Sequence, residues 1–409
     1  MALANIIMSF GICVIFMYIQ TFSAKELYHC SFQSERRNFS GDKEQFLDMI
    51  QKTAIDKILS GSFHIMLKEQ DGLILNAQPK TSNEHLCQDL VFRKLYRNIK
   101  KIYKVSPANR GAIIKQMLVL LKEDIPLWVI RLDVKHFFES IDRGFLMSRI
   151  EDKARLSSQS ILLLKLSDCY LKSSNHVGLP RGLAISSALS EEYMKYFDLD
   201  VKRMEGVYYY ARYVDDIIIF CSTETAQKNV WDKIPSMLRD LKLTLNTEKS
   251  YKWSNSSKQA LSYLGYNIRK VGKKEVEVSI ADKKINMIKT RITRAFAKYT
   301  KERDFEMLRN RIKFLTGNFT INSKATLAPI KVGVFFNYKE ITIYKQLKDI
   351  DKYYQRILHC KRGALCCKFL FSPEQVKCLE KYSFEFGFNS RVNHFFNKAM
   401  LTKIKQAWL

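Results

Sequence analysis

The stretch VYYYARYVDDIIIF, residues 207–220, decides how this chain is expected to fold. Aromatic and β-branched residues, which favour strands, flank a short turn that carries Asp215 and Asp216. This pattern predicts a tight β-hairpin with two adjacent carboxylates at its tip. Burying an ionised carboxylate is costly unless a cation compensates it, so the acid pair indicates a metal site rather than core packing.

A third carboxylate stands at the end of a second predicted strand, where the apolar run Leu127–Ile130 leads into Asp133. A lone acid there is usually a turn former or a helix cap, but the companion pair favours a shared site. Mg²⁺ prefers oxygen ligands, and two such ions roughly 3.5–4 Å apart stabilise the attacking and leaving oxygens of a phosphoryl transfer. We therefore expect Asp133 and Asp215 to hold two Mg²⁺ ions, with Asp216 as a weaker ligand or an orienting group.

The composition indicates a large protein that binds a polyanion. The 409 residues, 46% of them hydrophobic, are enough for two or three subdomains. Lys and Arg number 68 against 41 Asp and Glu, and the net charge of +27 is spread along the chain. Self-repulsion that keeps a protein soluble is one explanation, but we favour nucleic-acid binding. The nine scattered cysteines are typical of a reducing cytosol.

The N-terminus is an apolar run, IIMSFGICVIFMYI, over residues 6–19. It is shorter than the roughly 20 residues that span a bilayer, and it lacks the basic region of a secretory signal. We interpret residues 1–16 as an extension from a mis-assigned start, with a membrane anchor or a buried helix as alternatives. If Lys25, Arg36 and Arg37 stayed inside, even an anchor would leave the rest of the chain in the cytoplasm.

Between these features the chain reads mainly as helix. Residues 20–85 are mixed, with turn signals at Gly61 and at Asp71-Gly72. The further expectations are helices over 86–125 broken at Ser106-Pro107, helix over 144–172, an amphipathic helix over 227–241 that begins or is interrupted at Pro235, and a strand and turn over 263–268.

From about residue 280 the pattern predicts long basic helices. One apolar stripe at helical spacing consists of Ile285, Ile288, Ile292, Ala295 and Phe296. Residues 282–313 carry eleven Lys and Arg against four acids. A solvated helix face would explain this charge, and so would a face that follows phosphates, which we favour.

Five motifs follow one another along the chain: Asp133 with its strand, Gly178 to Ser187, Tyr213 to Asp216, Leu245 to Lys249, and Leu264 to Tyr266. Together they resemble the consecutive palm motifs of reverse transcriptases, over about residues 90–270. The resemblance implies a right-hand polymerase, a helix-rich α+β fold with fingers, a palm with an antiparallel sheet and a helical thumb. It divides the chain into an N-terminal extension (1–85), fingers and palm (86–270), and a basic helical thumb or RNA-binding region (275–409).

The resemblance also implies roles for the matching residues. Asp133, Asp215 and Asp216 would be the catalytic acids and metal ligands, and the backbone carbonyl of Val134 would complete a metal shell. Lys249 matches a lysine that protonates the leaving pyrophosphate, although it could also be an ordinary surface lysine.

Further matches concern the nucleotide. Phe138 lies where the family keeps an aromatic gate against the ribose 2′-hydroxyl, which favours deoxynucleotide substrates, although core packing beside Phe137 is an alternative. Arg110 and Lys115 fall where the fingers contact the incoming triphosphate, in a local sequence that departs from the usual pattern.

The glycine-rich segment departs from most reverse transcriptases, which have Gln in place of Arg181 and a Ser-Pro pair in place of Ser186-Ser187. It resembles the abortive-infection and defence-associated enzymes of bacteria, most closely the smaller subunit of their type 3 systems. Gly178 and Gly182 would let the backbone approach template or nucleotide, and Arg181 would add a charge-assisted contact.

The implied function is an RNA-directed DNA polymerase, a nucleotidyltransferase of antiviral defence that copies a dedicated non-coding RNA into DNA from dNTPs with two Mg²⁺ ions. A second reverse transcriptase subunit and a higher-order oligomer are the implied partners, and no membrane is expected. Three alternatives stay open: a template-independent or protein-primed polymerase on the same fold, a non-catalytic RNA-binding assembly subunit, and an intron-type maturase.

A cysteine cluster near the C-terminus, Cys360, Cys366, Cys367 and Cys378 with His359, lacks the C-x-x-C pair of zinc sites. We interpret the four cysteines as buried thiols rather than as zinc ligands.

Overall fold

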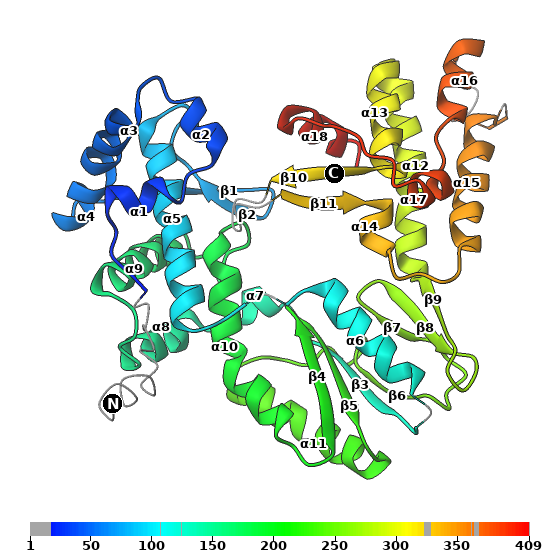
Figure 1. Cartoon of the computed structure of the whole chain (residues 1–409), viewed down its shortest axis with the longest axis horizontal. Coiled ribbons are helices and arrows are strands. Elements are labelled where there is room, and N and C mark those ends of the chain that lie inside the picture. The colour runs from blue at the N-terminus through cyan, green and yellow to red at the C-terminus, as the bar shows by residue number, and fades with distance from the viewer. Residues whose placement is uncertain are drawn as a thin grey trace, which may run out of the picture. The chain divides into compact units, whose positions relative to one another are not determined.

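The computed structural model describes residues 18–106, 108–123, 125–322, 329–360, 362–363 and 368–408. The chain forms two compact units, drawn with their elements in Figure 1. The first unit is Met1–Pro107 with Phe138–Met194, and the second is Ala108–Phe137 with Lys195–Leu409. The expectations for residues 1–16, Cys366 and Cys367 lie outside the described residues.

The first unit consists of helices and one two-stranded hairpin. Its helical elements are α1 (Ala24–Tyr28), α2 (Gln33–Arg37), α3 (Lys43–Ile50), η1 (Gln51–Ile55), α4 (Asp56–Leu59), α5 (Asn83–Ile102), α7 (Phe137–Ser140), α8 (Arg143–Asp152), α9 (Ser158–Ser173) and α10 (Ala184–Lys202). Phe137 of α7 and the end of α10 belong to the second unit. The hairpin pairs β1 (Leu67–Gln70) with β2 (Leu73–Asn76). Asp71 and Gly72 both have positive φ and close it, which confirms that turn signal.

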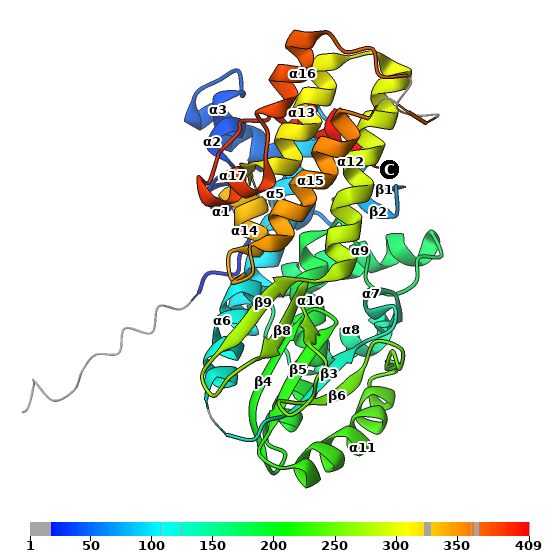
Figure 2. The same cartoon turned by 90° about the vertical axis from the view of Figure 1, so that its right-hand side faces the viewer.

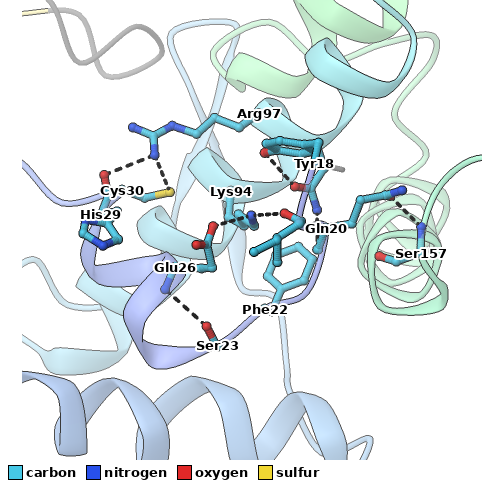
Figure 3. A network of polar contacts seen from close by, with 12 residues as sticks. Tyr18, Gln20, Phe22, Ser23, Glu26, His29, Cys30, Lys94, Arg97 and Ser157 are labelled. Atoms are coloured by element: carbon cyan, nitrogen blue, oxygen red, sulfur yellow. Dashed lines mark hydrogen bonds and ion pairs between the residues drawn. The ribbon is translucent and has the colours of Figure 1, made fainter. Parts of the chain in front are cut away.

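Two buried cations on α5 hold the N-terminal segment of the first unit. The Nζ atom of Lys94, a residue only 1% exposed, donates to the carbonyl of Ile19 and to Glu26, both at 2.7 Å (Figure 3). Arg93 binds both carboxylate oxygens of Glu35, each at 2.7 Å. Because a buried cation is costly without a partner, these pairs hold the segment against α5.

The second unit is built around a four-stranded antiparallel sheet in the order β4-β5-β3-β6. The strands are β3 (Trp128–Asp133), β4 (Val207–Tyr213), β5 (Asp216–Cys221) and β6 (Tyr251–Ser254). The predicted hairpin of residues 207–220 and the strand that leads into Asp133 are therefore confirmed. The helix α11 (Glu224–Asp240) packs against β3 and β5 (Figure 2). The helix α6 (Arg110–Lys122) adds apolar side chains to the same core as the sheet.

The predicted break of the amphipathic helix at Pro235 is wrong, because α11 runs through this residue. Proline removes one backbone hydrogen bond and crowds the preceding turn. The buried side chains of Val230, Ile234 and Leu238 lie on both sides of Pro235 and keep the helix packed. Tertiary packing therefore outweighs the local preference.

A second antiparallel sheet joins β7 (Leu261–Tyr263), β8 (Tyr266–Lys270) and β9 (Val276–Ile280). The turn between β7 and β8 is Leu264-Gly265, both with positive φ, which confirms the strand and turn expected there.

The rest of the second unit is mostly helical. Its helices are α12 (Asp282–Glu302), α13 (Phe305–Thr316), α14 (Val334–Tyr338), α15 (Lys345–Leu358), α16 (Pro373–Glu380), α17 (Phe384–Asn389) and α18 (Lys398–Lys405). The predicted stripe on α12 is confirmed, with four of its five residues buried and Ile285 partly buried.

A hairpin of β10 (Asn318–Asn322) and β11 (Pro329–Gly333) interrupts these helices, so the expectation of helices alone is wrong here. Phe319 of β10 packs against the nearby Phe314 and against Phe396, and the contact with Phe396 joins distant segments that local periodicity does not reveal. In the described part of the chain no helix has the length and apolar character needed to cross a membrane.

Gly178 offers a test of how tightly the first unit is packed. Its φ is +68°, and a Cβ there would lie 2.2 Å from the carbonyl oxygen of Phe138. Gly61 has a similar φ of +73°, but a Cβ would meet nothing within 4 Å. We expect Gly61→Ala to cost about 1–2 kcal/mol of the free energy of unfolding, for the left-handed backbone alone. Gly178→Ala should cost at least about 2 kcal/mol more, because backbone atoms must move. Urea unfolding of the purified variants measures both, and equal losses would contradict the packing described.

A candidate active site at the end of the central sheet

One face of the central sheet consists of three layers of side chains, defined by the strand register. The innermost layer is apolar and contains Tyr209, Phe220, Val129 and Trp253. The middle layer contains Ala211, Ile218, Arg131 and Tyr251. In the outer layer Asp133 lies directly opposite Asp216, beside Tyr213. Residues opposite one another in an antiparallel pair share a face, so the register brings the acids of two distant segments together.

The tip of the hairpin is a strained two-residue turn. Tyr213 pairs with Asp216, which leaves Val214 and Asp215 as the turn residues. Val214 has a φ of +62°, a conformation that a β-branched residue rarely adopts and for which such turns usually use glycine. This strain must be held by contacts elsewhere.

A buried ion pair supplies one such contact. The side chain of Arg212 is 3% exposed and forms two hydrogen bonds with the carboxylate of Asp198 on α10, at 2.9 and 2.8 Å. Its Nη1 atom donates to the carbonyl oxygen of Val214 at 3.1 Å. The hydroxyl of Tyr210 donates to Asp198 at 2.6 Å. The turn that carries Asp215 is thereby tied to a helix.

Asp133 is 5% exposed and is fixed by the segment that precedes β6. Its Oδ1 atom accepts from Asn246 Nδ2 at 2.8 Å and from Lys249 Nζ at 3.4 Å, and its backbone amide donates to Ser250 Oγ at 3.0 Å. Val134, the next residue, donates its amide to the carbonyl of Asp215 at 3.2 Å. Lys249, predicted to act on pyrophosphate, therefore contacts a predicted catalytic acid.

The two acids of the hairpin differ in their partners. Asp216 Oδ1 accepts from Arg131 Nη2 at 3.1 Å, and the backbone carbonyl of Asp216 accepts from the hydroxyl of Tyr263 at 3.0 Å. Asp215 forms no ion pair within the residues that the structure describes. Among the described residues, Asp216 thus pairs with Arg131 and Asp133 with Lys249, whereas Asp215 has no ion-pair partner.

The pKa values of the two hairpin acids are shifted by their surroundings. Burial raises the pKa of Asp215 above the ordinary value, and the nearby charges of Asp216 and Asp133 raise it further. Burial also raises the pKa of Asp216, although Arg131 opposes the shift. A raised carboxyl pKa means that the ionised form lacks compensation, which a bound cation would supply.

The oxygen donors at this end of the sheet fit a hard divalent cation. Within the described residues no group of three Asp, Glu, His or Cys side chains is arranged as ligands of a metal ion. The donors available are the carboxylates of Asp133 and Asp215 and the carbonyl of Val134. In an antiparallel pair the N–H and C=O of one residue point to the same side, so this carbonyl is expected on the side of Asp215. Carboxylate and carbonyl oxygens are suitable ligands for Mg²⁺.

Two other predicted residues lie on α6 of the same unit. Arg110 donates from Nε and Nη2 to the carbonyl of Leu264, at 3.0 and 2.6 Å, and from Nη1 to the carbonyl of Asn337 at 2.9 Å. Its guanidinium also lies 5.0 Å from the ring centre of Tyr266. Lys115 is exposed on α6. All three nitrogens of Arg110 are therefore engaged by the turn between β7 and β8 and by α14.

Phe138, Arg181 and Gly182 belong to the first unit. The carbonyl of Arg181 accepts from the amide of Ile74 at 2.7 Å, and a Cβ on Gly182 would lie 2.6 Å from the Ile74 carbonyl oxygen. The close backbone approach that Gly182 allows is thus made by β2 of the chain itself. The side chain of Arg181 is 57% exposed and pairs with Glu139 at 2.9 Å, while Phe138 is partly buried.

Several residues that contact or support the acids were not predicted from the sequence. Arg131 stands two positions before Asp133, and this spacing on one strand face was the available signal. Asn246 lies within the segment quoted for Lys249. The pairing of Arg212 with Asp198 joins a strand to a helix, and no local pattern indicates it.

The reverse transcriptase (RNA-dependent DNA polymerase) family model matches residues 65–268. No curated protein sequence matches the chain. Among solved structures, apo telomerase from Candida tropicalis truncated from its C-terminal domain is similar over 53% of this chain and 54% of that chain, with 15% identity and a TM-score of 0.38. Telomerase from Candida albicans in complex with a TWJ fragment of telomeric RNA is similar over 84% of this chain and 65% of that one, with 13% identity and a TM-score of 0.36.

The chain thus covers less than two thirds of the length of these two telomerase chains. The expected fold class, helix-rich α+β with antiparallel sheets, is confirmed. Residues 65–268, which include the hairpin, all three acids and Lys249, form a domain of the reverse transcriptase family.

Proposed function

We propose that this chain is an RNA-directed DNA polymerase that joins a primer 3′-hydroxyl to the α-phosphate of a dNTP and releases pyrophosphate. The observation that carries the proposal is the register of Asp133 against Asp216, with Asp215 in the adjoining turn, inside a reverse transcriptase domain. Asp215 has no ion pair among the described residues, and Asp133 lies beside Lys249. Acids in this arrangement suit phosphoryl transfer better than structural packing.

The residues have separate tasks in this proposal. Asp133 and Asp215, with the Val134 carbonyl, would hold two Mg²⁺ ions, which when bound neutralise the charge on the reacting phosphate. Asn246 orients Asp133 through its Oδ1 atom. Lys249 would give a proton from Nζ to the leaving pyrophosphate. Catalysis then depends on positioning the reacting groups and neutralising their charge, and rigid strands hold the acids in place for both.

The nucleotide contacts extend the proposal to further residues. Phe138 would exclude the ribose 2′-hydroxyl, and Arg181 and Gly182 would lie near the template or nucleotide. Lys115 is exposed and can reach a phosphate. Arg110 would have to exchange the carbonyls of Leu264 and Asn337 for phosphate oxygens.

The domain boundaries and the biological setting belong to the same proposal. We place an N-terminal extension in 1–85, fingers and palm in 86–270 and a basic thumb in 275–409. The resemblance of the Arg181 segment to defence-associated enzymes supports a role in antiviral defence, with a dedicated non-coding RNA and a second reverse transcriptase subunit, and we place the protein in the cytoplasm. Purifying the protein from its native operon and sequencing the bound RNA and DNA tests this setting. Recovery of a single enriched RNA is expected, and a random mixture would contradict a dedicated template.

The central prediction concerns the hairpin acids. Asp215→Asn with Asp216→Asn should keep the fold and nucleic-acid binding but reduce dNTP incorporation by at least about 10³-fold. The variant lacks the carboxylates that would hold the Mg²⁺ ions, so the charge on the reacting phosphate is no longer neutralised. Primer extension on an RNA template measures incorporation. Asp232→Asn changes an exposed acid on α11 of the same unit and serves as the control that should extend normally. Undiminished synthesis by the double variant would refute the mechanism.

A second prediction concerns the choice of sugar. Phe138→Ala should raise rNTP use relative to dNTP use by about tenfold or more, because a ring that blocks the 2′-hydroxyl is removed. Competing the two nucleotides in one extension reaction measures the ratio directly. An unchanged ratio with normal dNTP incorporation would show that Phe138 is only a packing residue.

The raised pKa of Asp215 predicts that this residue lowers the stability of the metal-free protein at neutral pH. The native state binds this proton more strongly than the unfolded chain, so the wild type loses stability as pH rises through the raised pKa. In EDTA at neutral pH, Asp215→Asn should raise the unfolding midpoint by about 2–4 °C, and the gain should vanish at pH values below the ordinary carboxyl pKa. Thermal scans across pH test this, with Asp232→Asn as the control, and a midpoint below that of the wild type would contradict it.

A further inference from the structure

Arg131 places a permanent charge in the middle layer of the sheet face. Ile218 lies opposite it on β5 and Tyr251 lies opposite it on β6. Its side chain is 17% exposed, and a guanidinium does not lose its proton in proteins. Such a charge between apolar neighbours requires a partner.

The contacts of Arg131 single out one partner. Its Nη2 atom lies 3.1 Å from Asp216 Oδ1, and its guanidinium carbon lies 5.8 Å from the ring centre of Tyr251. Its Nε atom is buried and has no hydrogen-bond partner among the described residues. Asp216 therefore provides the compensation for Arg131, with a weaker contribution from the aromatic face.

The two neighbours of Arg131 are themselves held in place. The hydroxyl of Tyr251 donates to the carbonyl of Ser262 at 3.1 Å and accepts from the Ser262 amide at 2.9 Å. The backbone of Asp216 is bound by Tyr263. Both contacts come from β7, so the second sheet fixes the two groups between which the guanidinium lies.

We propose that Arg131 is a built-in counter-cation for Asp216, a positioning residue that lets the acid cluster form without a bound metal ion. In this arrangement a guanidinium occupies one oxygen of Asp216, so Asp216 serves as an orienting group and Asp133 and Asp215 as the principal metal ligands. The inference rests on the proposed function for the identity of the competing cation. The pairing itself does not depend on polymerase activity.

A competing explanation is that Arg131 acts only by packing against Tyr251, and a double-mutant cycle separates the two. Arg131→Met keeps an unbranched apolar stem and removes the charge. In EDTA it should lower the unfolding midpoint by about 3–6 °C in the wild-type background. In an Asp216→Asn background the same change should cost less than half as much, because the charge to be compensated is gone.

Asp215→Asn supplies the matched control background, since it removes the neighbouring carboxylate that Arg131 does not contact. There Arg131→Met should cost as much as in the wild type. Equal costs in all three backgrounds would overturn the proposal in favour of packing. If Arg131→Met does not fold alone, a folded Arg131→Met, Asp216→Asn protein is the expected result, and failure of both would overturn the proposal.

Metal ions give a second readout independent of catalysis. Millimolar Mg²⁺ should raise the midpoint of Arg131→Met more than that of the wild type, because the ion then compensates Asp216 in place of the guanidinium. Arg131→Lys should behave as the wild type, since it keeps a cation at this position. An identical Mg²⁺ effect on Arg131→Met and wild type would contradict the proposal. If the wild-type protein shows no polymerase activity, the proposed function is refuted, but the pairing of Arg131 with Asp216 is not.

Discussion

The pairing of β3 with β5 is the constraint on which the rest of the structure depends. Its register sets Asp133 against Asp216 and Arg131 against Ile218. A slip of one residue would turn each of these side chains to the other face of the sheet, so the site and the core cannot be specified separately. The apolar inner layer of Phe220, Val129 and Trp253 therefore fixes the positions of the acids as well as the stability of the sheet.

The three acids occupy similar positions but are chemically distinct. Asp133 is fixed by an amide and a lysine, Asp216 by an arginine, and Asp215 stands on a strained turn without an ion pair in the described part of the chain. Such differences allow neighbouring carboxylates to take different tasks, because each environment favours a different balance between ionised and bound forms. The strained turn and the clustered acids are unfavourable by themselves, and buried contacts stabilise them, above all the ion pair of Arg212 with Asp198.

Much of this arrangement could be predicted from the sequence, and the failures have physical causes. The hairpin, the strand before Asp133 and the stripe on α12 depend on local periodicity, which the residues display directly. The continuation of α11 through Pro235 and the hairpin of β10 and β11 depend on packing between distant segments. Within the site, the acids carry a recognisable pattern, whereas Arg131 and Asp198 are ordinary residues until the register and α10 place them beside their partners.

The position of β3 in the sheet has a consequence for synthesis of the chain. This strand lies between β5 and β6, yet both partners follow it in the sequence, at residues 216–221 and 251–254. During translation β3 emerges with its apolar side chains exposed and with the N–H and C=O groups of both edges unpaired, and it cannot complete its hydrogen bonds until β6 has left the ribosome. Such non-local pairing is slow to form and leaves a hydrophobic strand open to other chains. The sheet that carries the acids is therefore exposed to association with other chains until its last strand has been synthesised.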